Sequence, residues 1–151
     1  MSAAAKGAIG IDHGARRTGF ATADAARIVV TPLDPAQGGN EEVLGGIARI
    51  LDERNVGHFV VGYPLRPDGT VGERAREVEA FIALLAARFP DVAIVRQDER
   101  LTTKEAEERL RDAGYHGPER KRRKDSWSAM VLLEDWIRAG EPPGIEPPER
   151  A

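Results

Sequence analysis

The segment "GIDHGARRTGFATAD", Gly10 to Asp24, ends a short apolar strand on one carboxylate and then returns along a second strand. The first strand, "GAIGID", closes on Asp12, and "TGFATAD" and "RIVVTP" follow at the spacing of β-hairpins. A carboxylate in this position could hold a metal ion, lie beneath the phosphates of a bound nucleotide, or accept backbone hydrogen bonds in a turn. These interpretations describe three different proteins.

Helices and strands alternate after this antiparallel ribbon. Asn40 is the expected N-cap of the first helix, and the pairs Thr70–Glu73 and Thr102–Glu105 have the spacing of capping boxes. The predicted strands are "HFVVGYP" and "DVAIVRQDER", and the predicted helices are "NEEVLGGIARILDERN", the segment after "RPDGT", "TTKEAEERLRDAG" and about Lys124 to Ala139.

This order predicts an α/β fold with a five-stranded mixed sheet, three antiparallel strands plus two parallel ones, flanked by helices. The first strand is expected to lie centrally, with the hairpin on one side and "HFVVGY" on the other. Ligands in open α/β sheets bind beyond the carboxyl ends of the strands. Asp12, Gly62–Pro64 and Gln97–Arg100 are therefore expected at one edge of the sheet.

Three acidic side chains are predicted at this edge. Glu99 follows a buried strand, and Asp125 begins a helical stripe that points toward the sheet. Each acid alone could be structural, and Asp125 could simply cap its helix. Together they would repel one another unless a cation lay between them, and hard cations such as Mg²⁺ or Mn²⁺ prefer oxygen ligands. Two such ions can activate water and stabilise the leaving oxygen in phosphodiester hydrolysis.

Length and composition limit the alternatives. The chain has 151 residues, enough for one domain, which we assign to residues 1–140, and it has no cysteine. Disulfides, thiolate catalysis and cysteine-based zinc sites are excluded. The N-terminal segment lacks the apolar run of a signal peptide and no stretch is apolar enough to span a membrane, so a cytoplasmic protein is expected. Residues 141–151 form a Pro-rich acidic tail that is expected to be disordered.

The net charge of −3 conceals a basic cluster. Five consecutive cations begin at Arg120, and in the predicted loop they could bind an anion or serve only as a solvated, solubilising segment. Cations near the acidic edge would neutralise the phosphates of a nucleic acid. The candidate nucleic-acid-binding residues are Arg16, Arg17, Arg100, Arg120, Lys121, Arg122, Arg123 and Lys124.

Four blocks in the same order give the chain a family resemblance: "GIDHGARRTGFA", "VVGYPLRPDGTVGERA", "DERLTTKEAE" and "KDSWSAMVLLE". From about Ala8 to Ile137 the sequence resembles the YqgF family, also called RuvX or the pre-16S rRNA nuclease family. The resemblance implies a ribonuclease-H-like fold and a magnesium-dependent nuclease, a hydrolase that matures the 5′ end of 16S rRNA in the small-subunit precursor. It implies that Asp12, Glu99 and Asp125 are the catalytic, metal-binding acids.

Several alternatives remain open at this stage. An older assignment of the family makes the substrate branched DNA, the Holliday junction, and a homodimer rather than a monomer would favour it because paired cuts need paired sites. A non-catalytic RNA-binding module on the same fold is a third interpretation. An actin-like ATPase is disfavoured, because Ala15 follows Gly14 without a hydroxyl and the chain has no second lobe.

Two positions depart from the family pattern. His13 and Lys124 stand where relatives usually have apolar residues. With no second histidine nearby in the sequence, His13 is expected to be a packed or partly exposed side chain rather than a ligand. Trp127 is a candidate for stacking on a base, whereas Trp136 lies on the apolar stripe of its helix and is expected in the core.

Overall fold

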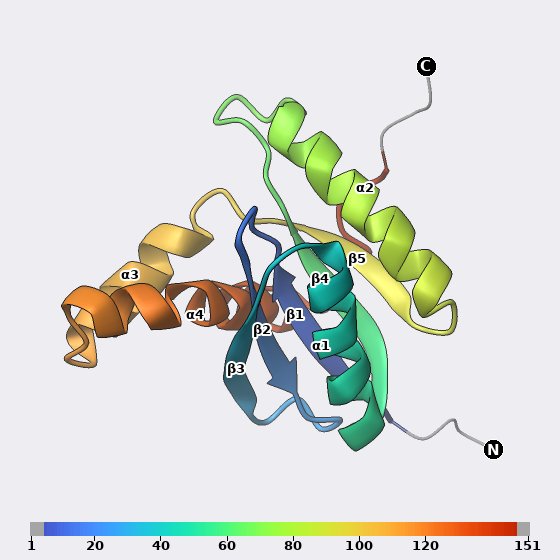
Figure 1. Cartoon of the computed structure of the whole chain (residues 1–151), viewed down its shortest axis with the longest axis horizontal. Helices are drawn as coiled ribbons and strands as arrows, with labels where there is room; N and C mark the ends of the chain where they lie inside the picture. The colour runs from blue at the N-terminus through green and yellow to red at the C-terminus, as the bar shows by residue number, and fades with distance from the viewer. Residues whose placement is uncertain (1–4, 148–151) are drawn as a thin grey trace.

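A computed structural model describes residues 5–147 and contains one five-stranded sheet in the order β3-β2-β1-β4-β5 (Figure 1). The β1 strand pairs antiparallel with β2, and β2 pairs antiparallel with β3, whereas β1–β4 and β4–β5 are parallel. The predicted sheet, with its first strand at the centre, is confirmed. The strands are β1 (Gly7–Asp12), β2 (Arg17–Ala23), β3 (Val30–Gln37), β4 (Val56–Tyr63) and β5 (Ala93–Asp98).

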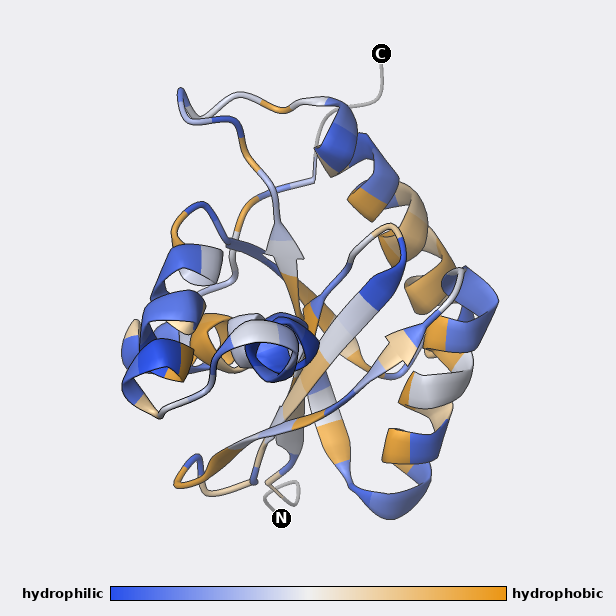
Figure 2. Cartoon of the chain, turned by 60° about the vertical axis from the view of Figure 1, so that its left-hand side comes forward, coloured by the Kyte–Doolittle hydropathy of each residue, from blue (hydrophilic) through white to orange (hydrophobic). Residues whose placement is uncertain are grey.

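Two pairs of helices cover the two faces of the sheet. The helices α1 (Asn40–Glu53) and α2 (Glu73–Arg88) bury one face together with Ile9 and Ile11 of β1. On the other face α4 (Gly117–Arg138) packs on Ala8 and its neighbours, and α3 (Thr102–Asp112) packs beside α4. Figure 2 shows the hydrophobic residues along the sheet and on the inner sides of the helices. Because side chains alternate along β1, Gly10 and Asp12 face α4.

Helix α4 lies unusually close to β1 and β2 because glycines meet it. A methyl group at Gly10 would lie 2.7 Å from the carbonyl oxygen of Ala129, and one at Gly19 would clash with the backbone of Asp125. The β2–β3 register shifts between Thr18 and Phe20, and the freed N–H of Phe20 donates to Ser126 Oγ at 3.3 Å. The pairing of β2 with β3 is therefore irregular at the point where α4 contacts the sheet at Asp125.

The start of α4 differs from the prediction. The helix begins at Gly117, seven residues before Lys124, so the basic segment 120–124 is helical and not a loop. Pro118 occupies the first turn, where its missing N–H costs no hydrogen bond. Glu119 forms ion pairs with Arg122 and Arg123 at 2.6 and 2.7 Å, at the i,i+3 and i,i+4 spacings that support a helix.

The predicted side-chain caps are wrong in all three helices concerned. The N-caps are Gly39, Gly72 and Leu101, and none of them has a side-chain cap hydrogen bond. Asn40 is the first residue of α1 and its Oδ1 instead contacts His13 Nε2 at 3.0 Å. The hydroxyl of Thr70 donates to Asp68 at 2.7 Å, within the preceding turn. Thr102 lies one residue inside α3, so it cannot act as the cap.

The first part of the predicted disordered tail is packed against β5. Gly144 forms a parallel bridge with Arg96, and the N–H of Ile145 donates to the Arg96 carbonyl at 2.7 Å. Trp136 is buried, as predicted, and its indole N–H donates to the Pro142 carbonyl at 3.0 Å. Residues 148–151 of the predicted tail lie outside the described residues. None of the helices within 5–147 is long and apolar enough to cross a membrane.

We expect Gly19→Ala to lower the free energy of unfolding by about 1–3 kcal/mol, the usual cost of an overpacked position, because its methyl group would displace α4. Chemical denaturation would measure the change. Gly45→Ala is the matched control: its methyl group has open space within α1, so it is expected to stabilise the chain by about 0.5–1 kcal/mol. Equal stability of the Gly19 variant and wild type would contradict the close approach.

Candidate functional site

Asp12 lies at the carboxyl end of the central strand, between two glycines. Gly19 of β2 is its cross-strand partner, and Gly62 follows Val61, the partner of Ile11, on β4. The missing side chains leave space on both sides of Asp12, on the face that α4 covers. The carboxylate of Glu99 fills the space over Gly62, and the backbone of α4 at Asp125 lies over Gly19.

Glu99 reaches the site from the turn after β5. Its backbone N–H donates to the Tyr63 carbonyl at 3.3 Å, which ties the turn to the end of β4. Its carboxylate lies directly over Gly62, where any β-carbon would clash with Oε2. In this position Glu99 shares a side-chain hydrogen bond with Asp12.

Asp125 reaches the site from α4, where its backbone presses on Gly19. It lies more than two turns inside the helix, which excludes the N-cap interpretation. Arg17 Nε lies 3.1 Å from Asp125 Oδ2, but this buried oxygen accepts no hydrogen bond. The contact is therefore an ion pair in which the N–H is not directed at the oxygen.

The pKa values of Asp12 and Glu99 are both raised in this crowded, buried site. Burial raises the pKa of Asp12 well above its usual value, and the charges of Glu99 and Asp125 raise it further. Burial also raises the pKa of Glu99, although the hydrogen bond to Asp12 and the charge of Arg74 oppose this. Like-charged acids at such a distance either retain a proton or need a cation.

Arg74, near the start of α2, belongs to the site and was not predicted from the sequence. Its Nη2 donates to the backbone carbonyl of His13 and lies 3.3 Å from His13 Nδ1, while Nη1 pairs with Glu77 at 2.6 Å. Its positive charge lowers the pKa of both Asp12 and Glu99. Arg74 stands in the quoted block "VVGYPLRPDGTVGERA", but nothing in its spacing separates it from the other arginines there.

His13 is a packed side chain, as expected. Its ring stacks on Phe81 with centroids 4.4 Å apart, and its two nitrogens face Asn40 and Arg74. Burial lowers the pKa of His13, so the neutral ring is favoured. His13 thus fixes the direction of Arg74 beside Asp12.

The predicted cationic residues divide into paired and unpaired groups. Arg17 contacts Asp125, Arg100 pairs with Asp98 at 2.9 Å, and Arg122 and Arg123 pair with Glu119. Within residues 5–147, no ion pair engages Arg16, Arg120, Lys121 or Lys124. Lys121 lies one turn before Asp125, so the unpaired cations of α4 begin next to the acids.

Trp127, the candidate for stacking on a base, is partly buried and already contacts another aromatic ring. It packs edge-on against Tyr115 with centroids 5.9 Å apart, and Arg123 lies over the same tyrosine at 4.4 Å. This small cluster joins the loop before α4 to the helix.

The acids resemble part of a ligand set for a divalent cation. Among residues 5–147 no three His, Asp or Glu side chains lie close enough together to hold a metal ion as they stand. The donor chemistry nevertheless fits magnesium, which usually takes one or two carboxylates and completes its octahedron with water and substrate phosphate oxygens. Asp12 and Glu99 supply such a pair, and the buried Oδ2 of Asp125, which pairs with Arg17 but accepts no hydrogen bond, is a further oxygen donor.

A family model described as "RuvX: Holliday junction resolvase" matches residues 6–139. The chain belongs to the RuvX family. Two RuvX relatives are each named "Putative pre-16S rRNA nuclease". The protein of Anaeromyxobacter sp. is 41% identical over 130 residues, 85% of this chain and 94% of the relative, and that of Salinibacter ruber is 34% identical over 131 residues, 85% and 90%. The family predicted from the sequence is confirmed.

The expected fold is also confirmed by a solved structure. "T. thermophilus RuvC in complex with Holliday junction substrate" superposes with a TM-score of 0.55 over 90% of this chain and 97% of that one. The two sequences are only 16% identical, so this likeness shows the ribonuclease-H-like fold alone. The names of the family model and of the RuvX relatives denote nucleases with two different substrates.

We expect Asp12→Asn to stabilise the metal-free RuvX chain at neutral pH. The folded state holds the Asp12 proton more tightly than the unfolded state. Stability therefore falls as pH rises from the ordinary pKa of 3.8 to the raised pKa of the folded state, and it is unaffected by this acid below 3.8. Removing the charge should raise the melting temperature on the order of 2–4 °C, the shift that about 1 kcal/mol causes in a domain of this size.

The gain should disappear at acidic pH, where Asp12 is protonated in both states. Exposed Asp52 of α1 supplies the control Asp52→Asn, which should not change the melting temperature at either pH. Thermal unfolding in EDTA at neutral and acidic pH measures both variants. A pH-independent gain would show that packing, and not charge, limits the stability of this site.

Proposed function

We propose that this RuvX chain is a metal-dependent nuclease that hydrolyses phosphodiester bonds in the 5′-end maturation of pre-16S rRNA. The observation that carries the proposal is the position of Glu99 over Gly62 beside buried Asp12, whose pKa is raised by burial and by the charges of Glu99 and Asp125. Arg74 and Arg17 lie beside these acids, yet the charges of Glu99 and Asp125 still raise the pKa of Asp12. The names of the RuvX relatives support the substrate.

Asp12, Glu99 and Asp125 are the residues that would hold Mg²⁺ or Mn²⁺. When bound, the cation supplies an activated water and stabilises the charge on the leaving oxygen. Asp12 and Glu99 would both have to be ionised to hold it, because a carboxylate must lose its proton to act as a ligand. Glycines on both sides of Asp12 give Glu99 and the backbone at Asp125 the room to approach it.

The arginines around the acids position the substrate. Arg74, fixed by His13, faces the Asp12–Glu99 pair and is suited to contact the phosphate that is cut. Arg17 holds Asp125 and is half-exposed, so a phosphate can share its guanidinium. Lys121 and Lys124 continue along α4 and would contact phosphates farther along the strand.

Two other functions rest on the same fold. The family model's description supports cleavage of a Holliday junction, which would require a dimer with paired sites. An RNA-binding module without catalysis would need no metal. We favour pre-16S rRNA because both relatives, aligned over at least 90% of their own length, carry that name.

We expect the protein to cut an end-labelled RNA from the 5′ end of the 16S precursor in Mg²⁺ or Mn²⁺ and not in EDTA. Asp125→Asn should abolish cutting. The loss in activity should exceed the roughly 10–100-fold that follows removal of an outer-shell partner of a metal ligand. Asp112→Asn, at an exposed position of α3, makes the same chemical change away from the site and should cut normally. A four-way DNA junction is tested in parallel.

Cutting of the junction alone would replace the proposal with the resolvase function. Binding of RNA without cutting, by a folded protein and in EDTA as well as in Mg²⁺, would favour the binding module. Addition of the precursor small subunit to the reaction distinguishes a missing partner from a missing activity.

Metal binding can also be measured without catalysis. We expect Mg²⁺ to raise the melting temperature of the wild type, since a ligand at 100 times its Kd stabilises the folded state by about 2.7 kcal/mol. The rise should be absent in Asp12→Asn and present in Asp52→Asn. An equal rise in all three proteins would remove Asp12 from the ligand set.

A further inference from the structure

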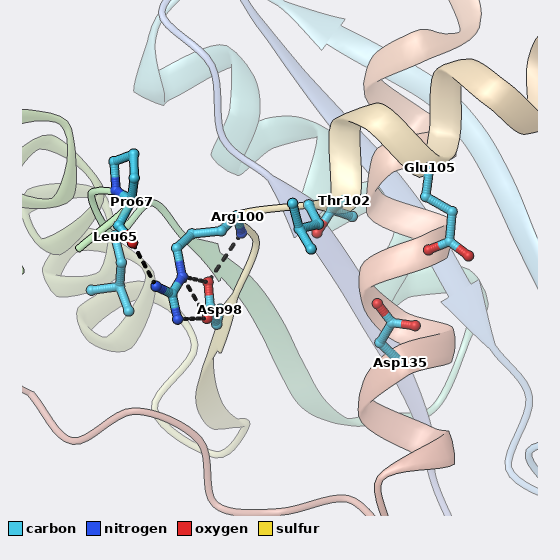
Figure 3. Close-up of a pocket in the computed structure, with 8 residues that line it drawn as sticks. Leu65, Pro67, Asp98, Arg100, Thr102, Glu105 and Asp135 are labelled. Atoms are coloured by element: carbon cyan, nitrogen blue, oxygen red, sulfur yellow. Dashed lines mark hydrogen bonds and ion pairs between the residues drawn. The ribbon is translucent and has the colours of Figure 1, made fainter. Parts of the chain in front are cut away.

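A cavity of about 560 Å³ opens at the carboxyl end of β5 (Figure 3). The loop after β4, the turn after β5, and helices α3 and α4 each contribute to its wall. Arg100 ties the first two together, because it pairs with Asp98 at 2.9 Å and donates to the Pro67 carbonyl at 3.3 Å. The lining residues are Leu65, Pro67, Asp98, Arg100, Leu101, Thr102, Glu105 and Asp135.

The cavity lies one residue from the proposed catalytic centre. Asp98 and Arg100 line it, and Glu99 between them turns its carboxylate toward Gly62 and Asp12. Adjacent residues are separated by about 3.8 Å of backbone. A phosphodiester held at Glu99 would therefore place one of its two flanking nucleosides at the mouth of the cavity.

Part of the wall is apolar and stands open to solvent. Leu101 exposes 76% of its surface, and Leu65 and Pro67 face the same space from the opposite loop. A large aliphatic side chain this exposed, beside a cavity of ligand size, is suited to cover the face of a flat ring.

The far wall is acidic. Glu105 of α3 and Asp135 of α4 point toward one another in Figure 3. Burial, and then the charge of Glu105, raises the pKa of Asp135, which pairs only loosely with Arg138 at 3.3 Å. Carboxylates accept hydrogen bonds and repel phosphate, so this end of the cavity selects a ligand that carries N–H donors.

We propose that this cavity binds the unpaired base of a nucleotide next to the cut phosphate, with guanine preferred. Leu101 and Leu65 cover the ring, and Glu105 with Asp135 accepts from its N–H groups. Guanine fits best because its Watson–Crick edge carries two adjacent donors, N1–H and the 2-amino group. A paired base hides this edge, so the cavity selects single-stranded RNA over a duplex arm. The inference rests on the proposed nuclease function.

Binding without cleavage provides the test. The probe is a short single-stranded RNA of uridines with one central guanosine, compared with the same RNA carrying adenosine or an abasic site there. Its affinity is measured by fluorescence anisotropy in EDTA, where no strand is cut. We expect the guanosine RNA to bind wild-type protein about tenfold more tightly than the abasic RNA, within the range of about 1–3 kcal/mol for one stacked base.

Matched variants locate the effect. Leu101→Ala should remove most of the tenfold preference, whereas Leu84→Ala, an exposed leucine of α2, should leave it unchanged. The double variant Glu105→Gln/Asp135→Asn should lose the discrimination between guanosine and adenosine. The double variant Glu108→Gln/Asp112→Asn removes the same charge from exposed positions of α3 and should retain it.

The two proposals fail separately. Equal affinity for the three RNAs, or equal loss in the control variants, would overturn the base-binding cavity even if the precursor RNA is cut normally. A guanosine preference that depends on Leu101 would support the cavity even if no RNA is cut with or without the precursor small subunit, and in that case the nuclease function alone would fail.

Discussion

The contact of α4 with a surface of glycines determines the rest of the structure. Gly10 and Gly19 allow the helix to lie on the backbones of β1 and β2, and the β2–β3 register shifts to accept it. Asp125 is thereby placed beside the strand end that carries Asp12. A helix held at the usual distance by side chains would place the third acid farther from the other two.

The site keeps its acids together at the expense of stability. Hydrophobic burial on both faces of the sheet supplies the energy, and Asp12 and Glu99 oppose it through desolvation and mutual repulsion. Arg74 and Arg17 offset part of this cost without neutralising the pair. Stability is commonly lower where a protein gathers like charges for chemistry, and these residues fit that pattern.

The sequence predicted the number of strands and their order because alternation and strand spacing are local signals. The third strand was placed too early: "RIVVTP" begins at Arg27, whereas β3 spans Val30–Gln37 and Arg27 lies in the turn before it with a positive φ. The sequence predicted Asp12 and Glu99 at one edge because the carboxyl ends of the sheet's strands meet there, and it predicted Asp125 at the same edge because the apolar stripe of its helix faces the sheet. The predicted helix starts were wrong because they depend on tertiary or turn contacts. Asn40 contacts His13, Thr70 donates to Asp68 in the preceding turn, and Glu119 pairs with Arg123 in helical turns that precede the predicted start. Arg74 was missed because its role depends on the packing of His13 against Phe81, 68 residues away in the chain.

The two outer strands of the sheet are protected in different ways. Pro32, Asp34 and Pro35 interrupt the free edge of β3 and discourage another strand from pairing with it. The edge of β5 has no proline, and the segment around Gly144 covers it with its own backbone. The segment around Gly144 therefore hinders self-association through β5. A chain shortened before Pro142 would keep its acids but expose the edge of β5 to strands of other molecules.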